Sequence, residues 1–87
     1  MNSSQNLDIA NEIFQRETDI KMLITARLGE HIKQRSLKIE GYSKWDLACE
    51  LEINARAIIL WMSGTYSFTI LEIVKIERVL GEKIINL

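Results

Sequence analysis

The 87-residue chain contains no proline, one cysteine, one histidine and four glycines. A lone cysteine cannot pair within the chain, so a disulfide-stapled scaffold is excluded. Long apolar runs are also missing, because the longest stretch without a polar residue, 57–62, is far shorter than the roughly 20 residues that span a bilayer. The N-terminal residues carry no basic cluster and no apolar run. We therefore expect no secretory signal and a reduced, cytoplasmic location.

Residues suited to catalysis or metal binding are scarce. His31 has no second histidine or cysteine at ligand spacing. Cys49 follows Ala48 on an apolar stripe and is predicted to be a small core residue rather than a nucleophile. The chain has no glycine-rich phosphate loop and no Ser-His-Asp order. We expect neither enzyme activity nor a metal or cofactor.

Charge of one sign does not dominate the composition. The 11 Lys and Arg residues oppose 12 Asp and Glu residues, giving a net charge of −1 at pH 7, which argues against a globally basic nucleic-acid binder. The distribution is uneven, since residues 1–20 sum to −3 and residues 21–41 sum to +3. An acidic arm before a basic segment allows one positive face on a neutral protein. Length and an apolar content of 47% fit one soluble globular domain.

Apolar residues spaced three and four apart predict an all-α fold of five helical segments. Between Leu7 and Leu37 we favour two helices or a bent one, with Thr18 and Asp19 capping the second; one continuous helix is the alternative. Gly41 interrupts the pattern. The later markers are the Ser43–Asp46 capping box, the Asn54 cap, the Ser63-Gly64-Thr65 stop after a helix through Met62, the Thr69–Glu72 capping box and the Gly81 stop. Residues 83–87 are expected to form an edge strand or a packed tail.

Two of these helices are separated by very few residues around Glu52 and Ile53, which predicts the sharp crossing of a helix-turn-helix. Residues 43–81 resemble the lambda-repressor-like helix-turn-helix family, also called the XRE family. The resemblance lies in Ser43-Lys44-Trp45-Asp46-Leu47-Ala48, the turn Glu50-Leu51-Glu52-Ile53-Asn54, the Ile58, Trp61, Ser63 and Gly64 pattern, and the closing Lys75-Ile76-Glu77-Arg78-Val79-Leu80-Gly81. Leu28 to Arg35 fits the family's first helix.

The resemblance implies a five-helix domain over residues 23–87 behind an N-terminal helical extension, residues 1–22. It implies a bacterial DNA-binding transcriptional regulator, a repressor, whose helix 54–62 enters the major groove. A homodimer would read two half-sites about 34–36 Å apart. The dimer surface would come from the N-terminal helix, with Leu7, Ile13 and Phe14, or from the tail with Ile84, Ile85 and Leu87. Some members of this family are antitoxins, so a toxin is a further possible partner.

The residues expected at double-stranded DNA are Lys33, Lys44, Trp45, Asn54, Ala55, Arg56, Ile59, Leu60 and Tyr66. Lys44 would face phosphate at its helix N-terminus. Asn54 is primarily a cap. Arg56 would reach a guanine edge or a phosphate, against an ion pair with Glu50 or Glu52. Trp45 and Tyr66 are weighed evenly between a DNA contact and partial burial with a polar tip in water.

The same segment departs from its family in one respect. Related chains carry polar residues where this sequence has Ala55, Ile59 and Leu60, and such residues offer no hydrogen bonds to base edges. Ile58 and Trp61 suffice for the buried face, so Ile59, Leu60 and Met62 cannot all be inside. An exposed apolar patch is typical of an interface. The alternative function is therefore a protein-interaction module on the same fold, such as an antitoxin or anti-repressor. Lys33, Arg35 and Lys38 supply the nearest positive charge.

Overall fold

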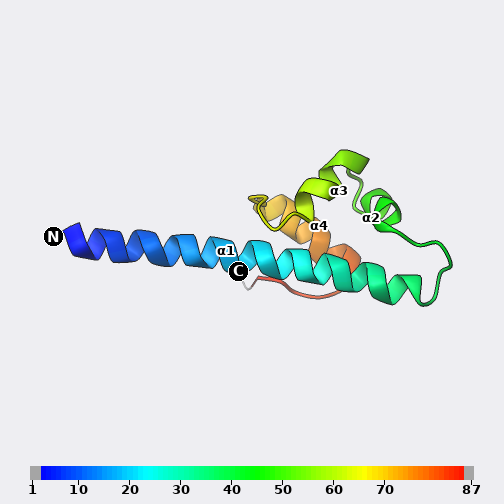
Figure 1. Cartoon of the computed structure of the whole chain (residues 1–87), viewed down its shortest axis with the longest axis horizontal. Coiled ribbons are helices and arrows are strands. Elements are labelled where there is room, and N and C mark those ends of the chain that lie inside the picture. Colours follow the sequence, from blue (N-terminus) through cyan, green and yellow to red (C-terminus); the bar gives the residue numbers. More distant parts are fainter. Residues whose placement is uncertain (1–2, 86–87) are drawn as a thin grey trace.

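A computed structural model describes residues 3–85 of the chain as four helices and no strand. The first, α1, runs over Ser3–Ser36 and is 34 residues long. Figure 1 shows it as one long rod, with the remaining helices gathered beside its C-terminal part. The expectation of all-α structure is confirmed, whereas the expectation of five helices is wrong because the first two are one.

The expected break at Thr18 and Asp19 is absent, and both side chains instead form hydrogen bonds to residues one turn earlier in the same helix. The Thr18 hydroxyl donates to the carbonyl of Phe14 at 2.9 Å, one turn back. Asp19 accepts a hydrogen bond from Gln15 at 2.9 Å. Such local bonds are compatible with an unbroken helix, so residues that favour caps need not start one. The alternative of one continuous helix is the arrangement found.

The other three helices are α2 (Lys44–Glu50), α3 (Ala55–Trp61) and α4 (Ile70–Leu80). The capping boxes at Ser43 and Thr69 are both present, and the Asn54 side chain accepts from the Ala57 amide. Gly81 ends α4 with a left-handed φ of 73°. Gly64 has a φ of 82° in the turn after α3, which ends one residue before the expected Met62. The helix starts marked by Ser43, Asn54 and Thr69 and the stop at Gly81 are therefore confirmed, whereas the expected end of α3 is one residue too late.

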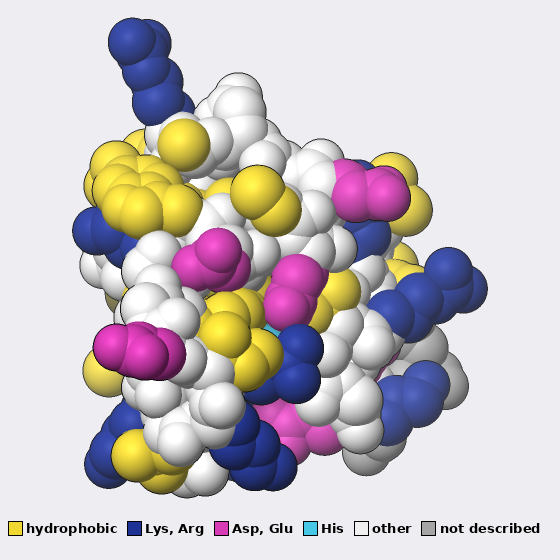
Figure 2. All heavy atoms as spheres, turned by 90° about the vertical axis from the view of Figure 1, so that its right-hand side faces the viewer, with side chains coloured by type: hydrophobic (Ala, Val, Ile, Leu, Met, Phe, Trp, Pro, Cys, Tyr) yellow, Lys and Arg dark blue, Asp and Glu magenta, His cyan; other side chains and the backbone are white. Residues whose placement is uncertain are grey.

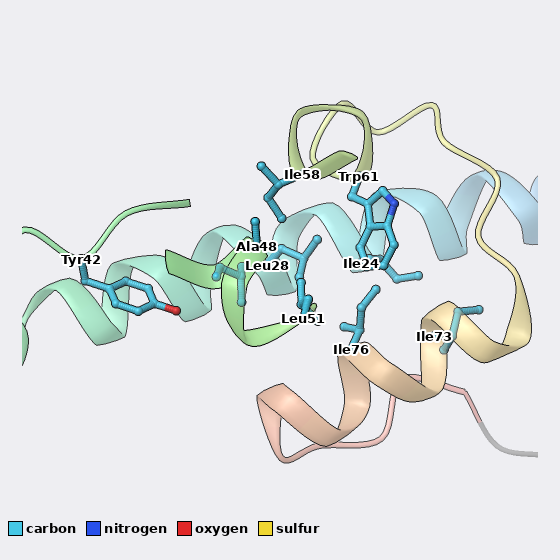
Figure 3. Close-up of a cluster of buried hydrophobic side chains, with 10 residues drawn as sticks. Ile24, Leu28, Tyr42, Ala48, Leu51, Ile58, Trp61, Ile73 and Ile76 are labelled. Carbon is cyan, nitrogen blue, oxygen red and sulfur yellow. The ribbon is translucent and has the colours of Figure 1, made fainter. Parts of the chain in front are cut away.

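The core lies between the C-terminal half of α1 and the three short helices. Figure 3 shows its side chains converging from all four helices. Six of them are fully enclosed, namely Ile24, Leu28, Leu47, Leu51, Ile58 and Ile76. Buried polar or charged residues are absent from the described part of the chain, so burial of apolar surface is the main force that holds the helices together.

Cys49 is exposed, which corrects the expectation of a core cysteine. Leu47, Ala48 and Leu51 define the buried side of α2. Successive residues turn about 100° around a helix, so Cys49 falls on the far side from those three. Its neighbour in sequence is buried while Cys49 itself faces solvent.

The C-terminal tail packs without forming a strand over the residues described. The amides of Ile84 and Ile85 donate to one Glu77 carboxylate oxygen at 2.7 and 3.2 Å. Both isoleucine side chains pack against the core. Leu87, which the sequence analysis places in the possible dimer surface of the tail, lies outside the described residues. Of the two expected forms, the packed tail is the one found.

The molecule is elongated because α1 extends far beyond the core. Its radius of gyration is 15.6 Å, against about 12 Å for a compact chain of this length. We call residues 6–19 of α1 the projecting segment and residues 20–85 the body. Every side chain of the projecting segment is exposed apart from a half-buried Thr18. Across residues 3–85, none of the helices combines the length and the apolar character needed to span a bilayer.

Candidate nucleic-acid interface

The turn between α2 and α3 sets the position of the candidate interface. α2 ends at Glu50 and α3 begins at Ala55, so the two helices are separate, as the sequence predicted. The Ile53 amide donates to the Ala48 carbonyl at 3.0 Å and closes the turn against α2. Glu52 adopts a left-handed φ of 57°, the only non-glycine residue described with positive φ. This backbone reversal lets α3 leave α2 in a new direction (Figure 1).

α3 is anchored on one side and exposed on the other. Ile58 is fully buried and Trp61 is 3% exposed, and the two lie three residues apart on one helix face. Ile59 and Leu60 are 52% and 56% exposed, as expected for residues with no room inside. Met62 is half-buried and packs against the core. The outer side of α3 is therefore accessible to a partner over most of its short length.

Lys44 and Trp45 lie together at the first turn of α2. The Lys44 ammonium is 4.9 Å from the centre of the Trp45 ring, a cation–π distance. Both residues are exposed, with Trp45 at 46%. A lysine is unfavourable at a helix N-terminus because the macrodipole is positive there. The ring offsets part of that cost, and the cation stays available to an anion.

Asn54 and Arg56 occupy the start of α3. The Asn54 side-chain oxygen accepts from the Ala57 amide at 2.8 Å, so its primary role as a cap is confirmed and its NH₂ group remains for outside contacts. Arg56 is exposed and takes part in none of the ion pairs found among the described residues. The expected alternative, an ion pair between Arg56 and Glu50 or Glu52, is not formed. Ala55 is exposed beside them.

Tyr66 is held within the body. Its ring stacks on Trp61 with centroids 6.0 Å apart and meets Phe68 edge-on at 4.9 Å. Its hydroxyl donates to a Glu72 carboxylate oxygen at 2.7 Å, and this bond raises the pKa of Tyr66. The tip therefore bonds to a carboxylate rather than to water. The ring braces the far end of α3.

Lys33 does not join the other candidate residues. Arg35 faces α2, because its guanidinium lies 3.2 Å from Glu50. Two residues along a helix correspond to a rotation of about 200°. Lys33 thus lies on the side of α1 that faces away from α2, where it is exposed. The structure brings together Lys44, Trp45, Asn54, Ala55, Arg56, Ile59 and Leu60 around α2 and α3, and leaves Lys33 apart.

A charged cluster that sequence reasoning did not identify fixes α2 to α1. Glu50 lies 3.2 Å from Arg35 and 3.5 Å from His31 Nε2. The Arg35 guanidinium also lies 5.8 Å from the Tyr42 ring centre. The hydrogen bond that Arg35 donates to Glu50 raises the pKa of Arg35. Burial, followed by the Glu50 charge, raises the pKa of Tyr42. Residues fifteen and nineteen apart in sequence meet here, so no local pattern announces the cluster.

The surface around α2 and α3 is mixed rather than uniformly basic. Figure 2 views the molecule from the end where the 37–43 turn, α2 and α3 lie, and shows apolar, basic and acidic side chains side by side. Lys44 and Arg56 are the basic residues of the two helices, opposed by Asp46, Glu50 and the adjacent Glu52. Electrostatic attraction of a polyanion to this face would therefore depend on these few cations.

Comparison of the chain with protein-family models, with curated proteins and with solved structures finds no match. Among residues 3–85, no three His, Cys, Asp or Glu side chains cluster in a way that would hold a metal ion.

Proposed function

We propose that this protein is a DNA-binding transcriptional regulator of the lambda-repressor-like helix-turn-helix type, in which α3 is the recognition helix. The observation that carries the proposal is the way in which α3 is held at the surface of the body. It follows α2 after a tight turn, is anchored by Ile58 and Trp61, and exposes its outer side. A helix held in this way at the surface suits insertion into a major groove about 12 Å wide.

The contacts in this proposal divide into two kinds. Lys44 binds backbone phosphate, which positions the protein. Arg56 reaches a base edge from the first turn of α3, and the Asn54 amide NH₂ assists it. Ala55 and Ile59 contribute apolar contact with thymine methyl groups. Repression follows if the bound site overlaps the binding site of RNA polymerase.

The test uses duplexes selected from a random pool by the full-length protein, followed by titration with fluorescence anisotropy. Arg56→Ala should weaken binding to the selected duplex by about 1–3 kcal/mol and relax the preference at one base pair. Lys44→Ala should weaken all duplexes alike and reduce the slope of affinity against salt. Lys33→Ala is the matched control, because Lys33 faces away from α2, and should bind like wild type.

The proposal fails if no duplex is enriched. It fails equally if affinity is independent of salt, or if Lys33→Ala costs as much as Lys44→Ala.

A second candidate is a protein-interaction module that uses α3 as a docking ridge. The observation that favours it is the exposure of Ile59 and Leu60 on α3 and of Trp45 on α2, two helices whose only cations are Lys44 and Arg56. Exposed apolar and aromatic side chains are typical of the centre of a protein interface. A toxin or a repressor would be the partner in this case.

Leu60→Lys separates the two candidates. An added cation on the outer side of α3 should leave duplex binding unchanged or strengthen it. The same change places a charge in the middle of an apolar contact and should abolish binding to a protein partner. Duplex affinity that collapses in Leu60→Lys, in a variant whose circular dichroism spectrum matches wild type, would count against the DNA-binding role.

A further inference from the structure

The charged cluster between α1 and α2 contains two buried side-chain atoms without a hydrogen-bond partner. They are His31 Nε2 and the Tyr42 hydroxyl oxygen, the only such atoms found among residues 3–85. The two rings meet edge-on with their centroids 6.3 Å apart. In Figure 2 the single histidine of the chain shows only as a small spot between acidic and basic side chains. A buried polar atom without a partner costs stability, so this pair calls for an explanation.

A carboxylate oxygen of Glu50 lies just beyond bonding distance of His31 Nε2. The separation is 3.5 Å, so a closure of about 0.6–0.8 Å would give the usual length of a charge-assisted N–H···O bond. If Nε2 carries no proton, two hydrogen-bond acceptors face each other there. A neutral ring with its proton on Nε2 can donate, but it lacks the attraction between opposite charges. The ring protonated at both nitrogens supplies the donor and the charge together.

The charged groups that face His31 favour a positive ring. Arg27 and Arg35 lie one helical turn before and after it on α1. The acidic groups around it are Glu30, Glu50 and Glu82, of which the first and the last line a hollow beside the ring. Two arginines against three glutamates leave an excess of one negative charge. Tyr42 adds no charge between about pH 5 and 8, because burial raises the pKa of its hydroxyl.

We infer that His31 and Glu50 form a proton-dependent clamp between α1 and α2, closed when the imidazole is positively charged and loosened when it is neutral. Histidine is the side chain whose charge ordinarily changes between about pH 5 and 8. Glu50 is the last residue of α2, directly before the turn from which α3 departs, so the clamp fixes that end of α2. The inference goes beyond the proposed function, because it concerns the contact between α1 and α2 and holds with or without DNA.

The direction of the pH effect follows from which state of the chain holds the proton more tightly. His31 and Glu50 are nineteen residues apart and separate on unfolding, so the charged pair exists only in the folded protein. Stability should therefore rise as the pH falls through the ordinary range of histidine, and be lost again as the pH rises. Arg35 limits the size of the effect, because its guanidinium lies 3.2 Å from the other Glu50 oxygen and already offsets part of that charge. The charged groups that share a second hollow with Glu50 are Glu52, Lys75 and Arg78.

Urea denaturation of the full-length protein at about pH 5.5 and about pH 8 tests the clamp. On going to the lower pH, the unfolding equilibrium constant of wild type should fall about two- to fivefold further than that of His31→Gln. This comparison cancels the groups that the two proteins share. Glu50→Gln should behave like His31→Gln. Arg35→Gln should show a larger effect than wild type, because the whole Glu50 charge is then left to His31. Tyr42→Phe is the matched control and should keep the wild-type effect.

The inference is overturned if wild type and His31→Gln respond equally to pH. It is overturned equally if wild type loses stability on acidification relative to His31→Gln, because burial of the ring would then outweigh the attraction to Glu50. An effect that persists in full in Glu50→Gln, or that shrinks in Arg35→Gln, would also contradict it. DNA binding enters none of these measurements, so failure here leaves the proposed role of α3 to its own test.

NMR spectroscopy of wild type keeps the inference testable if a variant does not fold. The chain has one histidine, so the imidazole signals report His31 alone. At about pH 5.5 the Nε2 proton should be observable, because a bond to Glu50 protects it from exchange with water, and the Glu50 amide should shift in step with the ring as the pH changes. An Nε2 proton that exchanges too fast to be seen, with a Glu50 amide that stays level while the ring titrates, would overturn the clamp.

Discussion

The two parts of α1 share one sequence pattern and have opposite surroundings. In the body, Ile24 and Leu28 are fully enclosed by α2, α3 and α4. In the projecting segment, Leu7 and Phe14 occupy the corresponding face and are more than half exposed. The apolar spacing is the same because a helix needs the same spacing to present one apolar face to any partner. Periodicity therefore indicates that a face is to be covered, without indicating whether the cover lies within the same chain.

The largest expected effect on stability comes from truncating one apolar side chain of α1 in the body, compared with one in the projecting segment. Leu28→Ala leaves a cavity in the core and should lower the free energy of unfolding by about 2–5 kcal/mol. Phe14→Ala removes a larger side chain from the projecting segment and should cost less than about 0.5 kcal/mol in dilute monomer. Urea denaturation followed by circular dichroism measures both.

Equal losses in the two variants would contradict the division of α1 into an enclosed and a projecting part. The concentration dependence of the Phe14→Ala effect carries further information. A loss that grows with protein concentration would indicate that wild-type stability includes a contribution from association.

A smaller effect is expected for threonines in two different helical positions. Thr69→Ala removes the cap of α4, whose hydroxyl accepts from the Glu72 amide at 3.2 Å, and should cost about 0.5–2 kcal/mol. Thr18→Ala lies inside α1 and should change stability by less than about 0.5 kcal/mol, because alanine has the higher helix propensity. Thermal unfolding of the two variants distinguishes them. A large loss for Thr18→Ala would mean that the residue marks a helix start after all.

Local signals account for what the sequence predicted well. The capping boxes at Ser43 and Thr69 and the stop at Gly81 depend on residues within one helical turn, and all three are found. The prediction of a helix break at Thr18 is wrong because a threonine hydroxyl can bond to a carbonyl inside a helix as well as cap the start of a helix. The prediction that Cys49 is buried is wrong because it rests on the burial of Ala48, although adjacent residues of a helix point in different directions.

The candidate interface was predictable to a similar extent. Exposure of Ile59 and Leu60 followed from counting how many side chains a short helix can bury. The separation of Lys33 from α2, and the hydrogen bond that ties Tyr66 to Glu72, depend on how elements distant in sequence pack together. The Glu50 cluster has the same origin. Such contacts are set by the tertiary arrangement, which no short motif encodes.

The body also contains a strained residue that the projecting segment lacks. Glu52 has a φ of 57°, in the turn between α2 and α3. An L-residue in this region costs roughly 1–2 kcal/mol, and glycine loses about 0.5–1 kcal/mol of backbone entropy on folding. Glu52→Gly should therefore stabilise the protein by up to about 1 kcal/mol, measured by urea denaturation. Glu52→Ala retains the strain and is the control. Stabilisation by alanine as large as that by glycine would assign the effect to the lost charge.

The smallest effect concerns the C-terminal tail, whose Ile84 and Ile85 are held to the body by hydrogen bonds to Glu77 and by packing on the core. Amide hydrogen bonds from Ile84 and then Ile85 lower the pKa of Glu77 below its usual value of 4.5. A carboxyl group with a lowered folded-state pKa stabilises above its unfolded pKa and loses that contribution as pH falls through the folded value. The tail should thus stay attached at neutral pH and loosen below about pH 4.5, where it would come to resemble the projecting segment. The amide NMR shifts of Ile84 and Ile85 should follow this titration in wild type and stay level in Glu77→Gln. An unchanged pH response in Glu77→Gln would show that another group controls the tail.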